Sequence, residues 1–366
     1  MLTYGDTLTV EGIPSAFPPV QVIFPEPYVL RLDARDVDHL SRNWYFAGRE
    51  VIITPSIEIY RINDGLIFPD SGFISDEDGR FIQESAKSRG NFLKGQDDFY
   101  RLRRGHIDLK DDGYSSTIHC GIQAKSIGHW VMDALPRLYA LSQLPFDVTI
   151  LQNEGITDWN KQLLSVFLPA NVKVRYVSGI KPFRVKKALL SPYLVPSSCA
   201  IWRPEIVRFM RETLFRYADS KPESKKRRFY IWRKEVGGMH GANRKVTNED
   251  ELTSMLAKYG IEPIAPETLT LKEKVELYRD SELIVGTPGS GLAVSFLATD
   301  AALIEIFPNG NGPDMDLQIW GWSIARSAGL KYYPIYHSYS AMPKEFEIDV
   351  DRVETTIRRA LEGSKS

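Results

Sequence analysis

The 366-residue sequence lacks the features that mark several classes of protein. Its two cysteines, Cys120 and Cys199, are too few for a disulfide framework and lack the paired spacing of a zinc site. No apolar run approaches the roughly 18 residues that a membrane span requires. The first residues, MLTYGDTLTVEG, have neither the basic nor the apolar region of a secretion signal. We therefore expect a cytoplasmic protein in a reducing compartment.

An excess of charge of one sign is also missing. The 46 lysines and arginines nearly balance the 47 aspartates and glutamates, which leaves a net charge of -1. Such a chain has no overall attraction to nucleic acid or anionic lipid, so we predict no nucleic-acid partner and expect any anion site to be local. The basic stretch DSKPESKKRR (219–228) leaves open a peripheral contact with the inner membrane.

Motifs for metal-dependent phosphate chemistry are scarce. The sequence has no GxxxxGK[ST] loop, and no repeat of fixed period. Asp314 and Asp316 are spaced as Asp-x-Asp, but they follow the C-terminal strands and fit a solvated turn. We predict no metal site and no cofactor.

The pattern of hydrophobic residues predicts an α/β protein of several domains. Residues 1–118 carry many prolines and glycines between short alternating runs, which indicates a β-rich N-terminal module. Strands and amphipathic helices alternate over 119–222 and, after the polar boundary stretch, over 223–340. Residues 341–366 read as one closing helix. Alternation of this kind predicts parallel sheets whose ligands bind at the carboxyl ends of the strands.

The strongest local signal is ELIVGTPGSGLAVSFLA, in which a strand enters a glycine-rich turn and a helix follows. Backbone N–H groups around Gly289, Ser290 and Gly291 can face an anion, and a diphosphate suits the positive end of a helix. The alternative is a tight turn with a purely structural role, for which glycine is equally suited.

Charged residues lie near the ends of neighbouring predicted strands. Arg233 ends FYIWR, and Arg244 with Lys245 precedes the next helix, so these three can converge on phosphates. Glu305 lies in AALIEIFP, where a carboxylate can accept hydrogen bonds from a ribose. The alternatives are that Arg233 continues the basic linker and that Glu305 forms a salt bridge with an arginine.

A second group of polar residues lies in GHWVMDALPRL. His129 and Asp133 are four residues apart and share one face of the predicted helix, with Arg137 four residues further on. Either His129 or Asp133 can serve as a general base at neutral pH. A buried structural histidine is the alternative for such a helix.

Five segments of the sequence together resemble glycosyltransferase family 61 in order and spacing, over about residues 119–335. They are GHWVMDALPRL, RFYIWR, NRKVTNEDEL, the segment from APETL to TPGSGL, and LIEIFP. Bacterial members of this family are often described as capsular polysaccharide biosynthesis proteins. The resemblance implies a GT-B-like fold of two Rossmann-like lobes facing a cleft, here with the β-rich N-terminal module added. It also implies an inverting, usually metal-independent transfer from a nucleotide sugar, most often a UDP-sugar, to a saccharide or lipid-linked saccharide.

The family's positions map onto this chain with two departures. His129 and Asp133 fall in its His-Trp-x-x-Asp segment, Arg233 and Arg244 at its two arginines, Glu305 at its late acidic position, and Gly289 and Gly291 in its glycine loop. Pro288 stands where the family usually has histidine, and Val294 where it has asparagine. A lost charge-assisted hydrogen bond is worth about 1.5–3 kcal/mol. His240, in the glycine-rich segment VGGMHGANR, is the candidate replacement, and this segment forms either a lid over the donor or an ordinary loop.

Two other functions fit the same residues. One is a relative that binds a nucleotide or glycan without catalysis, a reading that the two departures motivate. The other is a GT-B-like polysaccharide pyruvyltransferase, whose donor is a phosphoenol acid rather than a nucleotide sugar.

Overall fold

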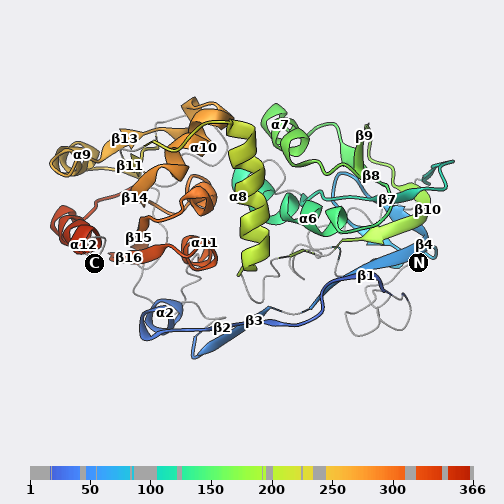
Figure 1. The fold of residues 1–366 in the computed structure, drawn as a ribbon, viewed down its shortest axis with the longest axis horizontal. Helices are drawn as coiled ribbons and strands as arrows, with labels where there is room; N and C mark the ends of the chain where they lie inside the picture. Colours follow the sequence, from blue (N-terminus) through green and yellow to red (C-terminus); the bar gives the residue numbers. More distant parts are fainter. Residues whose placement is uncertain are drawn as a thin grey trace. The chain divides into compact units, whose positions relative to one another are not determined.

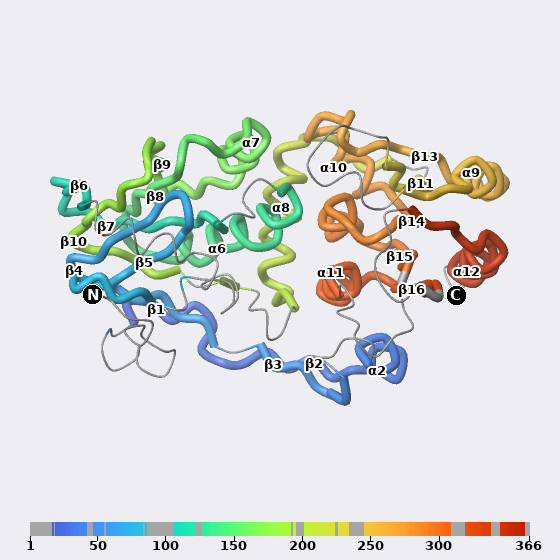
Figure 2. Tube along the Cα trace, turned by 180° about the vertical axis from the view of Figure 1, so that it is seen from behind, coloured from blue at the N-terminus to red at the C-terminus, as the bar shows by residue number. Residues whose placement is uncertain are grey.

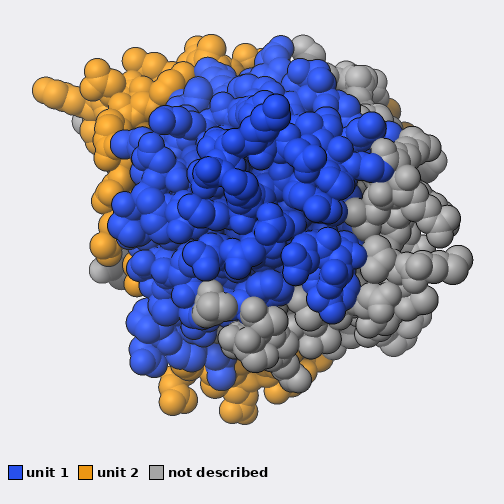
Figure 3. Space-filling model, turned by 90° about the vertical axis from the view of Figure 1, so that its right-hand side faces the viewer, with its two compact units in different colours: residues 1–28, 53–199 blue, residues 29–52, 200–366 orange. Residues whose placement is uncertain are grey.

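A computed structural model describes residues 17, 19–41, 47–54, 56–82, 85, 105–121, 126–191, 193–194, 201–223, 226–233, 245–309, 319–339 and 345–362. The chain divides into two compact units, which Figure 3 shows in blue and orange. Unit 1 comprises residues 1–28 and 53–199, and unit 2 comprises residues 29–52 and 200–366. The chain therefore leaves unit 1, enters unit 2 and returns before unit 1 is complete.

Unit 1 is built on a mixed sheet, eight-stranded in the described residues, whose main path runs β1-β4-β10-β7-β8-β9. The pairs β10·β7, β7·β8 and β8·β9 are parallel, while β4 runs antiparallel to both β1 and β10. Short strands β5 and β6 pair with β4 and β10. The bounds are β1 Pro19–Phe24, β4 Ile57–Ile67, β5 Ile74–Ser75, β6 Ile107–Asp108, β7 Tyr114–Ser116, β8 Val148–Asn153, β9 Val172–Val177 and β10 Phe183–Leu190.

The helices of unit 1 connect its parallel strands (Figure 1). Between β7 and β8 the chain forms α5 (Ile127–His129), the π-helix η3 (Trp130–Ala134) and α6 (Pro136–Ser142). Between β8 and β9 it forms α7 (Asp158–Phe167), which begins at Thr157, whose side chain accepts a hydrogen bond from the Asn160 backbone N–H at 3.2 Å. The alternation of strands and helices predicted for 119–222 is present here, with α7 between β8 and β9.

The structure divides the N-terminal half differently from the sequence-based domains. Residues 1–118 do not form a module of their own, because β4 hydrogen-bonds along the full length of β10. One hydrophobic core joins side chains from both sides of residue 118: Ile62, Ile67, Ile74, Ile82, Leu151, Val177, Phe183, Val185, Ala188 and Leu190. Pairing between strands more than 100 residues apart leaves no mark in the local sequence, so the composition change near residue 118 coincides with no break in the fold.

Unit 2 contains a parallel sheet of five described strands in the order β13-β11-β14-β15-β16. In chain order this is 2-1-3-4-5, a doubly wound arrangement. Helices α9 and α12 lie on one face, and α10 and α11 on the other (Figures 1 and 2). The bounds are β11 Arg227–Ile231, α9 Glu249–Ala257, β13 Glu262–Ile264, η5 Pro266–Thr268, α10 Leu271–Arg279, β14 Ser281–Gly286, η6 Leu292–Leu297, β15 Ala302–Asn309, α11 Trp320–Ala328, β16 Lys331–Tyr339 and α12 Val350–Glu362.

The side chains of β15 alternate between the two faces of this sheet. Ala302, Ile304 and Ile306 belong to the core formed with α9 and α12, together with Leu252, Leu256, Val353 and Ile357. Leu303, Glu305 and Phe307 therefore point to the opposite face. The predicted closing helix is confirmed as α12, whose buried Val353, Ile357 and Ala360 make it part of unit 2.

Helix α8 (Pro204–Ala218) also belongs to unit 2, where it packs against α10 and α11. Proline occupies its first turn, where its missing N–H leaves no helical hydrogen bond unmade. Arg211 of α8 donates to the carbonyls of Phe296 (2.6 Å) and Ala328 (2.9 Å), which fixes the helix to the ends of η6 and α11. The boundary predicted at residue 222 thus lies after an element that already packs in the second unit.

The first segment of unit 2, residues 29–52, contributes helix α2 (Ala34–Leu40), which lies between β2 (Tyr28–Arg31) and β3 (Val51–Thr54) in the chain. These two strands pair with each other. Asp33 and Asp36 form a capping box at the start of α2. Asp36 also accepts a hydrogen bond from Trp322 Nε1 at 2.8 Å and forms an ion pair with Arg326 at 3.0 Å. The sequence analysis missed this helix within a region it described as β-rich.

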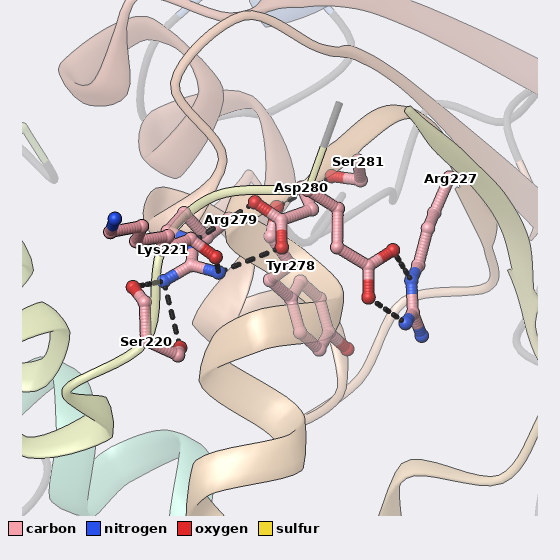
Figure 4. A network of polar contacts seen from close by, with 8 residues as sticks. Ser220, Lys221, Arg227, Tyr278, Arg279, Asp280 and Ser281 are labelled. Atoms are coloured by element: carbon pink, nitrogen blue, oxygen red, sulfur yellow. Dashed lines mark hydrogen bonds and ion pairs between the residues drawn. The ribbon is translucent and has the colours of Figure 1, made fainter. Parts of the chain in front are cut away.

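A buried ion pair holds the segment after α8 (Figure 4). Arg279 donates to both carboxylate oxygens of Asp280, at 2.9 and 2.8 Å, and also to the carbonyls of Ser220 (2.8 Å) and Lys221 (3.1 Å). Both side chains of the pair are almost fully buried. The predicted boundary stretch is therefore attached to the beginning of β14, at the end of the sheet opposite to the glycine-rich turn.

Among the described helices, none combines the length and the apolar character needed to cross a lipid bilayer.

Candidate functional site

The strand order of unit 2 singles out one position on its sheet. From β11 the chain moves outward to β13, and from β14 it moves in the other direction to β15 and β16. At such a switch point, adjacent connections leave on opposite faces and open a crevice at the carboxyl ends of the two central strands. Arg233 follows β11, and the turn Thr287–Gly291 follows β14, so both lie at this switch point.

The glycines of the turn allow β11 and its following arginine to approach closely. Arg233 Nη2 donates to the carbonyl of Pro288 at 2.6 Å. A Cβ at Gly289 would collide with the Arg233 guanidinium, and a Cβ at Gly291 would come within 2.8 Å of Ile231. Tyr278 donates to the carbonyl of Gly291 at 2.8 Å. The glycines thus have the structural role expected of a tight turn, and they also leave space for the Arg233 guanidinium at the switch point.

The helix predicted after this turn is a 3-10 helix. The backbone N–H groups of Leu292 and Ala293 donate to the carbonyls of Gly289 (3.0 Å) and Ser290 (3.1 Å), which is the tighter i to i+3 pattern. Of the turn itself, Pro288 is buried, Gly289 is half-buried and Ser290 is exposed. Val294, the second departure from the family pattern, is half-buried within η6.

Glu305 occupies a more enclosed position than the sequence analysis supposed. It pairs in register with Gly286, the last residue of β14, but its side chain is only 1% exposed. Its carboxylate accepts a hydrogen bond from Tyr332 at 2.6 Å and lies against Gly321 of α11, where a Cβ would clash with it. Burial, together with the charge of Glu305, raises the pKa of Tyr332 well above its usual value. A tyrosine is thus the partner that this buried carboxylate required, and its contact with a ribose stays a prediction.

Of the other predicted donor residues, Lys245 lies in β12 (Lys245–Val246), which pairs with β17 (Glu345–Phe346). Its Nζ is 3.9 Å from the Glu345 carboxylate, and both side chains are exposed. His240 and Arg244 lie outside the described residues, as do Asp314 and Asp316.

Unit 1 has a switch point of its own. The chain passes from β7 to β8 and β9, and then returns to place β10 on the other side of β7. His119 and Cys120 follow β7, while Ser191 and Tyr193 follow β10. The helical segment after β7 therefore begins beside the carboxyl ends of both strands, the position where parallel sheets bind ligands.

A π-helix shapes this segment. The Leu135 N–H donates to the carbonyl of Trp130 at 3.0 Å, five residues back, rather than four. Pro136 follows immediately, and its ring has no N–H and clashes with the carbonyl four residues before it, so a wider turn accommodates it. Single π turns of this kind are frequent at functional sites. The sequence predicted a helix here, and the proline was the available signal of its irregularity.

His129 and Asp133 meet as predicted. His129 Nδ1 lies 2.8 Å from Asp133 Oδ2. The side chain of His129 is 20% exposed, whereas that of Asp133 is 1% exposed. The imidazole is therefore the member of the pair that reaches the surface, and the carboxylate behind it fixes the orientation of the ring. In such an arrangement the imidazole can act as a general base that the carboxylate orients, and this role stays a prediction.

Arg137 is fully buried behind this pair. Its Nε donates to the carbonyl of Ser191 at 2.9 Å and its Nη1 to that of His119 at 3.5 Å, so it joins the ends of β10 and β7. Its guanidinium lies 4.9 Å from the centre of the Tyr193 ring. Burial, and then the charge of Arg137, lower the pKa of His119 to about 4, so that this histidine is neutral near pH 7. The sequence analysis missed His119 and Tyr193, although both closely follow a strand end.

Within the described ranges, no three His, Cys, Asp or Glu side chains are grouped as metal ligands. The independence of the reaction from metal stays a prediction.

The mixed α/β fold with parallel strands is compatible with an α/β glycosyltransferase. Residues 127–304 match the family model of Glycosyltransferase 61. The matched range contains His129, Asp133, Arg233 and the glycine-rich turn, whereas His119 and Cys120 precede it and Glu305 follows its last residue. The resemblance found in the sequence motifs is thereby confirmed, over a shorter range than 119–335. No curated protein matches the chain.

Proposed function

We propose that the protein is an inverting glycosyltransferase that transfers a sugar from a nucleotide sugar to a saccharide hydroxyl, independently of metal. The match to the Glycosyltransferase 61 family model supports the glycosyltransferase class. The observation that carries the mechanism is the contact between His129 Nδ1 and Asp133 Oδ2, at the strand ends of unit 1 and within the matched range. The two-lobed GT-B arrangement is part of this proposal.

In this mechanism His129 is the general base and Asp133 orients it. With the proton on Nδ1 donated to Asp133, Nε2 carries the lone pair that accepts the proton of the acceptor hydroxyl. The hydroxyl oxygen forms a bond to the anomeric carbon of the donor sugar as the bond from that carbon to the diphosphate oxygen breaks. The electron pair of the broken bond leaves with the nucleoside diphosphate, and attack from the opposite face inverts the anomeric centre.

Unit 2 would bind the donor. Arg233 places its guanidinium beside the turn of Gly289, Ser290 and Gly291, where the charge can stabilise the departing diphosphate. Arg244, Lys245 and His240 are the further phosphate ligands of this proposal, and Glu305 is its ribose ligand. A UDP-sugar is the proposed donor. A saccharide or lipid-linked saccharide of a cell-surface polysaccharide, such as a capsule, is the proposed acceptor, and the proposed location is the cytoplasm or the inner face of the membrane.

The first test is a calorimetric titration of the protein with UDP, GDP, CMP and their sugar conjugates, with and without EDTA. We expect saturable, EDTA-insensitive binding of one nucleotide. Arg233→Met should weaken this binding, whereas Arg208→Met, which changes an exposed arginine of α8 in the same unit, should not. The second step is to measure the release of nucleoside diphosphate in the presence of saccharide acceptors.

The outcomes separate the alternatives. Binding of a nucleotide sugar with neither transfer to an acceptor nor hydrolysis of the donor would favour a non-catalytic relative, consistent with Pro288 and Val294 in place of the family's polar residues. Binding of phosphoenolpyruvate in place of nucleotides would favour a pyruvyltransferase.

A further inference from the structure

The segment that comprises β9, β10 and the turn between them concentrates positive charge. Residues 171–190 contain six lysines and arginines and no aspartate or glutamate, although the two signs nearly balance over the whole chain. Lys173, Arg175, Lys181 and Lys186 are exposed. In the described part of the chain, Arg175 and Lys181 form no ion pair. The charge of these two side chains is therefore available to a partner in solution.

Exposed apolar side chains lie around the same turn. Tyr176, at the end of β9, is 43% exposed, and Ile180, in the turn, is 44% exposed. Ile107 of β6 is exposed as well, and it adjoins the turn because its backbone N–H donates to the carbonyl of Pro182 at 3.0 Å. β6, β9 and β10 lie at the same end of unit 1 (Figure 2). This end of the unit thus combines apolar surface with basic side chains.

The position of β9 brings these side chains to one edge of the sheet. β9 is the last strand on the described path, so both of its faces border the same edge. Lys173 and Arg175 point to one face, and Tyr176 points to the other. Lys161 of α7 places its ammonium 6.0 Å from the centre of the Tyr176 ring. Basic side chains next to an exposed tyrosine are typical of surfaces that rest on an anionic membrane, where the ring enters the headgroup region and the cations meet lipid phosphates.

Neighbouring carboxylates reduce this charge but form only exposed pairs. The Lys173 ammonium is 3.3 Å from the carboxylate of Asp147, and that of Lys186 is 2.5 Å from the carboxylate of Asp112. All four side chains are more than half exposed. Ion pairs at such positions are weak, so a charged surface can displace them.

The basic stretch 219–228, from which the sequence left a membrane contact open, is built differently. Arg227 pairs with Glu223 at 2.7 Å, within the stretch itself. Arg228 pairs with Glu282 at 2.5 Å and is partly buried. Both arginines of the stretch are thus engaged with carboxylates of unit 2. The structure therefore favours the β9–β10 segment over this stretch as a membrane contact.

We propose that the β9–β10 surface, defined by Lys173, Arg175, Tyr176, Ile180 and Lys181, binds the protein to an anionic lipid bilayer that carries its acceptor. The three cations attract the lipid phosphates, and Tyr176 and Ile180 enter the headgroup region. This inference deepens the proposed function, and it rests on that function for the choice of a lipid-linked rather than a soluble saccharide as acceptor.

The first test is sedimentation of the full-length protein with lipid vesicles. We expect binding to vesicles of phosphatidylcholine mixed with phosphatidylglycerol, weakening as salt is added, and little binding to phosphatidylcholine alone. The double variant Arg175→Gln, Lys181→Gln should bind about tenfold or more weakly, since each basic residue near an anionic surface contributes roughly fivefold. Lys226→Gln, which removes an exposed charge from the stretch 219–228, is the control and should bind normally.

Two further measurements separate the apolar from the charged contribution and connect the surface to transfer. Ile180→Ser should weaken vesicle binding several-fold, and this loss should persist at salt concentrations that screen the charges. The double variant should lower kcat/KM for a lipid-linked acceptor in anionic vesicles. It should leave kcat/KM unchanged for the same saccharide without its lipid.

Two results would overturn the proposal. One is the absence of binding to anionic vesicles at low salt, which would leave the basic residues of β9 the role of preventing an edge strand from pairing with another sheet. The other is an equal loss of binding in Lys226→Gln and in the double variant. Vesicle binding requires neither donor nor transfer, so normal binding without transfer from any donor would overturn the proposed function and not the membrane surface.

Discussion

The two candidate sites lie at equivalent topological positions, the switch points of the mixed sheet of unit 1 and the parallel sheet of unit 2, but they are built in opposite ways. In unit 2 the site depends on missing side chains, because Gly289 leaves the space that the Arg233 guanidinium occupies. In unit 1 it depends on charge, because His129, Asp133 and Arg137 lie in a row into the interior. Added volume should therefore damage the first site, and altered charge or protonation should damage the second.

The largest expected effect comes from the base of unit 1. His129→Gln should lower the transfer rate by about 10²- to 10⁴-fold, the usual contribution of a general base, because glutamine cannot accept the hydroxyl proton. Asp133→Asn should lower the rate as well, since the amide no longer selects the tautomer of His129. The measurement is kcat for nucleotide release, alongside the donor Kd by calorimetry. An unchanged donor Kd in both variants is expected, and a large loss of donor affinity would show that the two sites are not separable.

The difference between the sites also explains how much the sequence could predict. The alternation of strands and helices over 223–340 is a local pattern, and each predicted element is present, with LAVSFLA as a 3-10 rather than an α-helix. The strand order was not predictable, because it depends on which strands pair. For the same reason the joining of β4 to β10 was missed. Helix α2 was missed although Asp33 and Asp36 provided a capping signal.

For the sites, spacing predicted contacts within one helix but not across strands. The pair of His129 and Asp133 followed from residues four apart, and it is present at 2.8 Å. That Asp133 is buried and His129 reaches the surface follows from packing, and so does the enclosure of Glu305 by α11 and Tyr332. Those packing contacts decide which residue meets the ligand.

The buried His119 offers a second way to test the sensitivity of unit 1 to protonation. Its pKa of about 4 lies below the 6.5 of an unfolded histidine, so the unfolded chain binds more protons as the pH falls. The free energy of unfolding should then decrease between about pH 6.5 and pH 4, by roughly 3 kcal/mol in total from this group. Urea unfolding of the protein and of His119→Gln should show a stability difference that narrows over this range. A difference that stays constant with pH would mean that His119 is not held neutral.

For unit 2 the corresponding test adds volume. Gly289→Ala should displace the flexible end of Arg233 and weaken donor binding by about tenfold or more, since a charge-assisted hydrogen bond is worth about 1.5–3 kcal/mol. Stability should change little, because the guanidinium can move. Gly291→Ala meets the branched Ile231 instead and should lower the thermal midpoint. The measurements are the donor affinity by calorimetry and the Tm of both variants, with Ser254→Ala of α9 as the exposed control. Normal donor binding by Gly289→Ala would contradict the comparison of the two sites.

The smallest expected effect is a response of unit 2 to protonation, at a site away from its switch point. His337 Nδ1 donates to the carbonyl of Phe307 at 3.0 Å, and its Nε2 accepts the Asp349 N–H at 2.9 Å, next to the start of α12. Burial lowers the pKa of His337, so its neutral form is favoured in the fold and its contribution to stability is lost as the pH falls below about 6.5. Protonation converts Nε2 from acceptor to donor, and amide exchange in the first turn of α12 should therefore accelerate at low pH. In His337→Gln this acceleration should be absent. The change should be smaller than that caused by His119, because the hydrogen bond between His337 and the Phe307 carbonyl opposes the effect of burial on the pKa of His337. An equal or larger response in α12 would mean that unit 2 is no less sensitive to protonation than unit 1.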